Sequence, residues 1–248
     1  MSNSTTPHSL FLSQYKVLIC TTGKRELLIK FLETLMNTAK YKGDILIINY
    51  INQDCRELMK NYKNIILVNT KQVYSHIAHD RFRAFYEALV EQHIGSMYDI
   101  IMCIDGDDIW FNGNLEELFN LAKDRVCYVT HDKTLNRNWH PYADTGNIEY
   151  WENIKDKPLA SCGMFIGPRE LIFQIFEHMY KYMKIMKKEN DIFGIDMYLF
   201  NCMIYYFNIP SREVDVKWNT SVFKNKYKRS HIIIHCITTV IKGELIDE

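Results

Sequence analysis

The sequence is most informative at Tyr98-Asp-Ile-Ile-Met-Cys-Ile-Asp-Gly-Asp-Asp-Ile-Trp-Phe111, where a short apolar run passes directly into a cluster of aspartates. The apolar run, 99–104, predicts a buried β-strand. Asp105, Asp107 and Asp108 follow it where the chain leaves the predicted sheet, and open α/β sheets bind ligands at that edge. Carboxylates this close repel one another unless a cation offsets their charge. Because carboxylate oxygens are ligands of Mg²⁺ and Mn²⁺, the cluster predicts a metal site that also binds phosphate oxygens.

Other interpretations of the cluster compete with a metal site. A segment rich in Asp and Gly also forms ordinary solvated turns, and this alternative stays open. An EF-hand calcium loop is excluded, because the residue at its sixth position, where glycine is required, is Trp110. A phosphatase of the DxD type is disfavoured, since its aspartates usually follow the first strand and precede a threonine, whereas here they lie in mid-chain and precede Ile109.

Short apolar segments alternate with amphipathic ones along the rest of the chain. We expect strands over 16–20, 44–49, 65–69, 99–104, 126–130, 162–166 and 232–235, and helices over 24–39, 53–61, 78–93, 169–188 and 196–207. The segment 132–158 has no clear period and is expected to be a long loop. The alternation predicts one α/β domain over 15–248, with a mostly parallel mixed sheet flanked by helices and a flexible N-terminus, 1–14.

Composition narrows the class of protein. Thirty acidic residues balance thirty basic ones, which disfavours a nucleic-acid-binding protein. The seven cysteines are scattered without the spacing of a zinc site, so reduced thiols are expected. The sequence has neither a signal peptide nor an apolar run of the roughly 20 residues that cross a bilayer. We therefore expect a cytoplasmic protein without a membrane span.

The strand and its aspartates resemble the DxD motif of GT-A glycosyltransferases, and Asn114-Leu-Glu-Glu-Leu-Phe119 resembles the short helix that follows this motif in those enzymes. Four further segments occur in the order found in the family, so the resemblance covers residues 15–245. It implies a single Rossmann-like GT-A domain and a nucleotide-sugar donor such as a UDP-sugar. It also implies Mn²⁺ or Mg²⁺ as cofactor and a hydroxyl acceptor such as a glycan.

The resemblance also implies residues that bind the donor. Relatives carry an arginine before the DxD strand that reaches the diphosphate or the carboxylates. Arg81 and Arg83 lie on different sides of the expected helix, and we expect Arg81 to face the site. Asp105 and Gly106 are expected to contact the donor within the motif. In the first strand-to-helix turn, the expected nucleotide contacts are Thr21, Thr22 and Arg25.

A second segment, Ala160-Ser-Cys-Gly-Met-Phe-Ile-Gly167, resembles the family strand that places small residues beside the donor sugar. Ser161 and Gly163 are the implied contacts there. Many relatives have Asn or Ser-Gly where this chain has Ser161-Cys162-Gly163, so the residue that hydrogen-bonds the sugar stays open. An ordinary buried strand with a close-packed glycine is the alternative.

Two late segments complete the resemblance. Gly194-Ile-Asp-Met-Tyr-Leu-Phe-Asn201 resembles the family element Gly-x-Asp-Gln-x-x-x-Asn, with Met in place of Gln. Asp196 is therefore the candidate sugar or acceptor contact and, for an inverting enzyme, the general base, although it also suits a helix cap. In glycogenin-like enzymes a late His binds Mn²⁺ and a later Lys binds the diphosphate. His235 and Lys242 have that order, although the usual Gly and Pro-Trp around the His are absent. A structural role for a lone His after an apolar strand is the alternative.

The predicted metal ligands are Asp105, Asp107 and His235. Some related families use an Asp-x-x-Asp spacing, which would select Asp108 instead of Asp107. The aromatic residues expected to stack on the acceptor sugar are Trp139, His140, Tyr142, Tyr150 and Trp151, and the alternative is that this aromatic-rich loop folds onto the core. The pattern leaves open whether the enzyme retains or inverts the anomeric configuration. A sugar-phosphate nucleotidyltransferase and a non-catalytic carbohydrate-binding relative of the fold are the competing functions.

Overall fold

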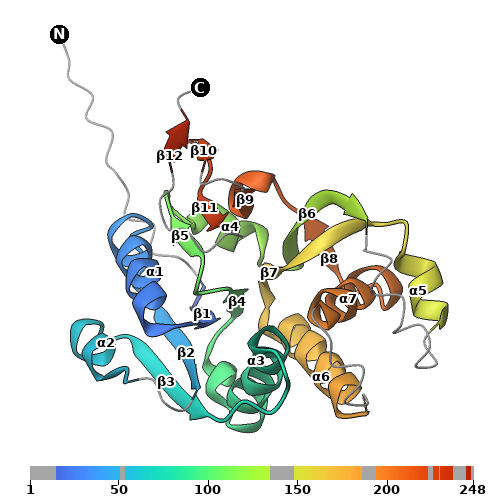
Figure 1. Cartoon of the computed structure of the whole chain (residues 1–248), viewed down its shortest axis with the longest axis horizontal. Helices are drawn as coiled ribbons and strands as arrows, with labels where there is room; N and C mark the ends of the chain where they lie inside the picture. The colour runs from blue at the N-terminus through green and yellow to red at the C-terminus, as the bar shows by residue number, and fades with distance from the viewer. Residues whose placement is uncertain are drawn as a thin grey trace.

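The computed structural model describes residues 15–50, 54–134, 148–185, 194–222, 226–228, 230–236 and 244–246. Within them, seven strands form a central sheet with the order β3-β2-β1-β4-β7-β6-β8 (Figure 1). These strands are β1 (Val17–Thr22), β2 (Asp44–Tyr50), β3 (Ile65–Thr70), β4 (Ile100–Ile104), β6 (Val126–Thr134), β7 (Pro158–Pro168) and β8 (Ser211–Glu213). β1 to β4 run parallel, β7 is antiparallel to β4 and β6, and β8 is parallel to β6.

Two small sheets accompany the central one. In the first, β11 (Ile233–Cys236) lies between β5 (Ile109–Phe111) and β9 (Thr220–Val222), antiparallel to β5 and parallel to β9. In the second, β10 (Lys226–Lys228) pairs in parallel with β12 (Glu244–Ile246). The register of the first sheet places His235 opposite Ile109, the residue that follows Asp108. A late segment of the chain is thereby brought to the aspartate cluster.

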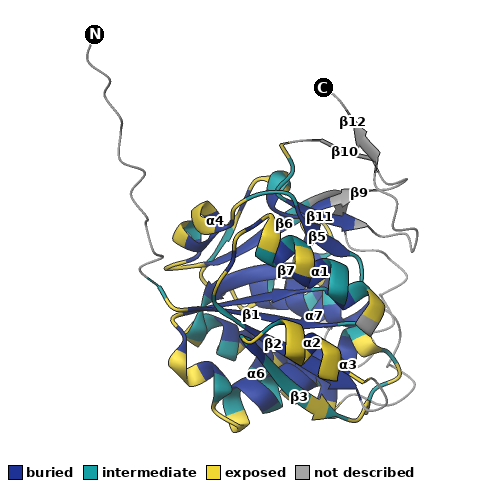
Figure 2. Ribbon diagram, turned by 90° about the vertical axis from the view of Figure 1, so that its left-hand side faces the viewer, coloured by how far each residue is buried: buried dark blue, intermediate teal, exposed yellow. Residues whose placement is uncertain are grey.

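Helices cover both faces of the central sheet (Figure 2). One face packs against α1 (Arg25–Asn37), α2 (Arg56–Asn61) and α4 (Glu116–Leu121). The other packs against α3 (Ile77–Tyr86), α5 (Ile148–Ile154), α6 (Arg169–Ile185) and α7 (Ile195–Asn201). α3 continues into the π-helical turn η1 (Glu87–Glu91), and α7 continues into the π-helical turn η5 (Cys202–Tyr206). Two short 3₁₀ helices are η2 (Ile94–Met97) and η6 (Val216–Trp218). No helix in the described ranges is both long and apolar enough to cross a membrane.

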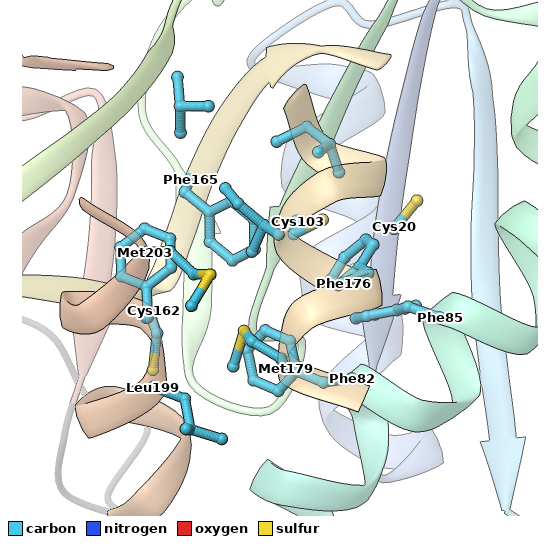
Figure 3. Packing of buried hydrophobic residues seen from close by; sticks show 14 of the residues in the cluster. Cys20, Phe82, Phe85, Cys103, Cys162, Phe165, Phe176, Met179, Leu199 and Met203 are labelled. Atoms are coloured by element: carbon cyan, nitrogen blue, oxygen red, sulfur yellow. The ribbon is translucent and has the colours of Figure 1, made fainter. Parts of the chain in front are cut away.

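Each buried strand is a continuous apolar run in the sequence, because successive side chains enter the hydrophobic clusters on opposite faces of the sheet. In β1, Leu18 and Cys20 join the cluster under α3 and α6, whereas Val17 and Ile19 join the cluster under α1. Figure 3 shows the first cluster, in which aromatic rings of α3, α6 and β7 pack together. α3 is buried at every position from 79 to 85, so its polar side chains lie inside the protein.

The expected α/β fold, with a mostly parallel mixed sheet flanked by helices, is confirmed. The expected loop over 132–158 is wrong at its ends, because β6 extends to Thr134 and 148–154 forms α5. The spacing of Ile148, Trp151 and Ile154 fits a helix, but two turns are too short to show a convincing period. The short strands β5, β8, β9, β10 and β12 were not expected, because three residues carry no readable alternation.

Candidate metal and donor site

Two strand pairings assemble the site at the carboxyl end of β4. The backbone N–H of Asp105 donates a hydrogen bond of 3.0 Å to the carbonyl oxygen of Gly163, which extends the antiparallel pairing of β4 with β7. The pairing of β5 with β11 sets His235 opposite Ile109. The aspartate cluster, the glycine of β7 and the late histidine therefore meet at the edge where α/β sheets bind ligands.

Three side chains converge at this edge. The Nε2 atom of His235 lies 3.2 Å from Oδ2 of Asp108 and 3.7 Å from Oδ2 of Asp105. One ligand atom from each of the three residues lies within 4.8 Å of the others. His235 is buried, and the two aspartates are partly exposed. Two carboxylate oxygens and one imidazole nitrogen at this spacing match the donors that a divalent transition-metal ion accepts.

Asp107 points elsewhere. Its Oδ1 accepts a hydrogen bond from the backbone N–H of Lys24, immediately before α1 begins. A carboxylate at this position satisfies a free N–H group and interacts favourably with the helix dipole. Burial raises the pKa of the Asp107 carboxyl above its ordinary value; the Lys24 N–H opposes this rise and the charge of Asp108 adds to it. The arrangement therefore differs from the expected one, with Asp108 in the place beside His235 that we expected Asp107 to take.

Gly163 allows the close approach of these groups. A Cβ atom at this position would lie 2.7 Å from Cε1 of His235 and 2.9 Å from Oδ2 of Asp105. Neither distance is compatible with ordinary van der Waals contact. The glycine of the Ser161-Cys162-Gly163 segment thus leaves the space that the imidazole and the carboxylate occupy.

The end of β1 borders the aspartate cluster. The N–H of Gly106 donates a 3.1 Å hydrogen bond to the carbonyl of Thr22, and a Cβ on Gly106 would lie 2.6 Å from Oγ1 of Thr21. The hydroxyls of both threonines are buried and have no hydrogen-bond partner among the described residues. Both expected nucleotide contacts therefore lie beside the motif. The side chain of Arg25 and the whole of Lys242 lie outside the described residues.

The two arginines of α3 have different partners. Arg81 forms an ion pair with Oδ1 of Asp105. Arg83 instead forms ion pairs with Asp80 and Glu87, and its Nη2 donates a 2.8 Å hydrogen bond to the Lys71 carbonyl. Arg81 is thus the arginine at the site, whereas Arg83 ties the chain that precedes α3 to the helix.

Asp196 is buried next to Arg81, with 6% of its surface exposed. Its Oδ2 lies 3.5 Å from Nη2 of Arg81 and accepts a hydrogen bond of 3.2 Å from the thiol of Cys162. Its Oδ1 lies 3.7 Å from Nε2 of His79. Burial, followed by the negative charge of Asp196, raises the pKa of the Cys162 thiol well above its ordinary value, so the thiol keeps its proton.

Ser161 is held by a neighbour that the sequence analysis did not identify. Its Oγ accepts hydrogen bonds from Nδ2 of Asn219, at 3.2 Å, and from the N–H of Gly163, at 3.3 Å. Nothing in the sequence around Asn219 signals this contact. His79 was also missed, although it lies three residues before Phe82, a spacing that places both side chains on the same face of a helix.

The site carries an excess of negative charge. Among the described residues, four carboxylates gather near two cationic side chains, those of Arg81 and Lys24, so formally two positive charges face four negative ones. The carboxylates belong to Asp105, Asp107, Asp108 and Asp196. Because partial burial makes such repulsion costly, a divalent cation beside Asp105 and Asp108 would offset most of it.

The aromatic residues expected at the acceptor divide into three groups. Trp151 is buried in the core, with 4% of its surface exposed, so its predicted contact with an acceptor sugar is wrong. Tyr150 is partly exposed and packs against Tyr206, with ring centroids 4.2 Å apart. The remaining three, Trp139, His140 and Tyr142, lie outside the described residues.

Comparison with known proteins shows which class of fold the chain has. No family model matches the sequence, and no curated protein does. Among solved structures, the chain is similar to mouse xyloside xylosyltransferase 1 in its apo form, with a TM-score of 0.54 and 13% sequence identity. The match covers 90% of this chain and 97% of that one. At this identity the likeness concerns the fold alone, which is of the GT-A type, a mostly parallel mixed sheet flanked by helices.

Proposed function

We propose that this protein is a metal-dependent glycosyltransferase that moves a sugar from a nucleoside-diphosphate sugar, a UDP-sugar, to a hydroxyl group of an acceptor such as a glycan. The observation that supports this proposal most is the convergence of Asp105, Asp108 and His235 at the ligand-binding edge of a GT-A sheet. A fold alone does not define an activity, so the argument depends on these residues.

The residues fit a divalent cation. Oxygen and nitrogen donors together favour Mn²⁺ over Mg²⁺, which prefers oxygen ligands. The carboxylates of Asp105 and Asp108 and the imidazole of His235 would hold the ion. Nε2 of His235 faces both carboxylates and is the nitrogen that would act as the ligand. When bound, such an ion supplies Lewis-acid stabilisation to a diphosphate.

Other groups of the chain would bind the donor. Arg81 adds a fixed positive charge beside Asp105, where it can offset the negative charge that develops on a departing diphosphate. Thr21 and Thr22, whose hydroxyls have no hydrogen-bond partner among the described residues, are proposed as contacts of the nucleotide. Arg25 and Lys242 are proposed as further contacts, on the basis of the sequence resemblance alone.

Turnover of a panel of nucleotide sugars tests this function. We expect the protein to release nucleoside diphosphate from a UDP-sugar in the presence of Mn²⁺, and to stop when the metal is chelated. The double variant Asp105→Ala with Asp108→Ala should lose this release. A variant of the exposed residue Asn153, Asn153→Ala, should keep it and serves as the control.

Two results would contradict the proposal. The first is the absence of metal-dependent nucleoside diphosphate release from every nucleotide sugar tested, which a non-catalytic carbohydrate-binding protein would give. The second is release of pyrophosphate from a nucleoside triphosphate and a sugar phosphate, which identifies a nucleotidyltransferase.

A further inference from the structure

Arg81 is shared between two carboxylates. Its Nη1 pairs with Asp105, and its Nη2 lies 3.5 Å from Oδ2 of Asp196 and 3.3 Å from the carbonyl oxygen of Cys162. The residue is buried, in the middle of α3. A guanidinium group is planar and rigid, so a contact that fixes one of its ends also sets the direction of the other.

Asp196 faces protein groups with both of its oxygens. Oδ2 contacts Arg81 and accepts the hydrogen bond from the Cys162 thiol, while Oδ1 is 3.7 Å from His79. His79 is completely buried. A general base needs an oxygen within hydrogen-bond reach of the acceptor hydroxyl. A carboxylate enclosed by these three residues is better placed to hold Arg81 than to meet a substrate.

Cys162 links the two charged groups. Its thiol donates to Asp196 and lies 3.7 Å from Nη2 of Arg81, which donates to the sulfur. Cys162 belongs to the apolar cluster under α3 and α6, together with Leu199 and Met203 (Figure 3). In such an environment a hydrogen bond is strong, and a carboxylate that loses one is costly. Cys162 therefore helps to fix the orientation of the Asp196 carboxylate.

We propose that Asp196 is a positioning residue, which acts on the metal site through Arg81, and that Cys162 and His79 hold it in place. The proposal rests on the function proposed above. Asp196 contacts the Nη2 end of Arg81, so that Nη1 meets Oδ1 of Asp105 and Oδ2, the oxygen that faces His235, is left for a cation. Without the charge of Asp196, Arg81 would pair more fully with Asp105 and compete with the metal ion.

A double-mutant cycle between Asp196 and Arg81 tests this proposal. The measured quantity is Mn²⁺ affinity, determined by calorimetry on the wild type, Asp196→Asn, Arg81→Gln and the double variant. We expect Asp196→Asn to weaken Mn²⁺ binding about tenfold in the wild-type background, as for other groups that orient metal ligands. In the Arg81→Gln background its effect should fall below about twofold, since coupled residues are not additive. An equal effect in both backgrounds would overturn the proposal.

A second set of variants avoids the removal of a buried charge. Cys162→Ala removes the thiol donor and should weaken Mn²⁺ binding about fivefold, the factor that corresponds to the typical net free energy of one hydrogen bond. Cys162→Ser restores a donor and should stay close to the wild type. The control is Cys127→Ala, which changes a buried cysteine of β6 outside the site. Equal losses for Cys162→Ala and Cys162→Ser would refute a role for the hydrogen bond.

These measurements separate the two proposals, because Mn²⁺ affinity does not depend on turnover. A wild type that binds Mn²⁺ but releases no nucleoside diphosphate would contradict the proposed function, and the cycle would still decide the role of Asp196. A wild type that turns over the donor, with additive effects of Asp196→Asn and Arg81→Gln on Mn²⁺ affinity, would contradict only the positioning role. A wild type without Mn²⁺ affinity would overturn both.

Discussion

Asp107 and Asp108 are neighbours in the chain, but their carboxylates have different surroundings. Asp108 lies 3.2 Å from the imidazole of His235, whereas Asp107 accepts the N–H of Lys24 before α1. The sequence could not predict which of the two aspartates faces His235, because both fit a spacing found in related families. Backbone geometry after Gly106 decides which carboxylate turns toward β11 and which toward the helix.

The two aspartates therefore form a matched pair of variants. We predict that Asp108→Asn lowers Mn²⁺ affinity by about 100-fold or more, because loss of a ligand should cost at least as much as loss of a residue that orients one. Asp107→Asn should lower it far less, and Asp107→Ala, which removes the acceptor of the Lys24 N–H, should destabilise the start of α1 by about 1 kcal/mol. Calorimetric titration and urea denaturation measure the two effects. A larger loss of Mn²⁺ affinity in Asp107→Asn would reverse our assignment.

Gly163 gives a second prediction at the scale of single residues. A methyl group in Gly163→Ala would press on His235 and on Asp105, so the imidazole and the carboxylate must move apart. We expect Mn²⁺ binding to weaken at least tenfold, and the unfolding free energy to fall by about 1–3 kcal/mol. The matched control is Gly113→Ala, where the nearest contact is the end of the Ile232 side chain. Wild-type Mn²⁺ affinity in Gly163→Ala would contradict the close packing of the site.

At the scale of elements, the side chain of Asn201 joins α7 to the backbone of β7. Asn201 is completely buried; its Oδ1 accepts the N–H of Ala160 at 3.0 Å and its Nδ2 donates to the Ala160 carbonyl at 2.9 Å. The Asn201 amide thus forms with the backbone of Ala160 the two hydrogen bonds that a neighbouring strand would otherwise form. Because α7 carries Asp196 and β7 carries Cys162, this bond keeps the two residues in register.

Asn201→Ala should therefore destabilise the protein. The substitution leaves a buried backbone N–H and C=O without their partner, and we predict a loss of about 2–4 kcal/mol in unfolding free energy. The measurement is urea denaturation, compared with Asn153→Ala, whose exposed side chain bonds only within α5 and should cost about 0.5 kcal/mol or less. Equal costs for the two variants would show that the amide does not join α7 to β7.

Some elements were readable from the sequence and others were not. β4 and the aspartates after it were predicted because a buried parallel strand is a continuous apolar run with a polar end. The pairing of β5 with β11 was not, since both strands are short and far apart in the chain, and short strands are defined by tertiary contacts. The position of His235 beside the aspartates was inferred from the order of the family motifs. The pairing of β5 with β11 gives its physical reason. The burial of Trp151 likewise depends on α5, which the sequence did not reveal.

At the scale of the whole molecule, the charges cancel in number but not in position. Thirty acidic and thirty basic residues give no net charge, yet the described part of the site combines four carboxylates with two cationic side chains, those of Arg81 and Lys24. A protein that binds a cation at such a place gains stability from it, because the ion binds the folded state and relieves repulsion there.

We therefore predict that Mn²⁺ raises the melting temperature. At a free concentration of about 100 times its Kd, the ion should add about 2.7 kcal/mol to the unfolding free energy. Chelation should reverse the gain, and Asp108→Asn should abolish it. Thermal unfolding at several Mn²⁺ concentrations measures the effect. The same shift in Asp108→Asn as in the wild type would mean that the ion binds at another place.

Anomalous diffraction from crystals soaked with Mn²⁺ and UDP tests the central claim most directly, because it locates the ion and the nucleotide together. The account predicts a manganese peak bonded to Asp105, Asp108 and His235, with the diphosphate of UDP against the ion and its nucleoside beside Thr21 and Thr22. A peak bonded to Asp107 without Asp108, or no manganese at this edge of the sheet, would contradict it.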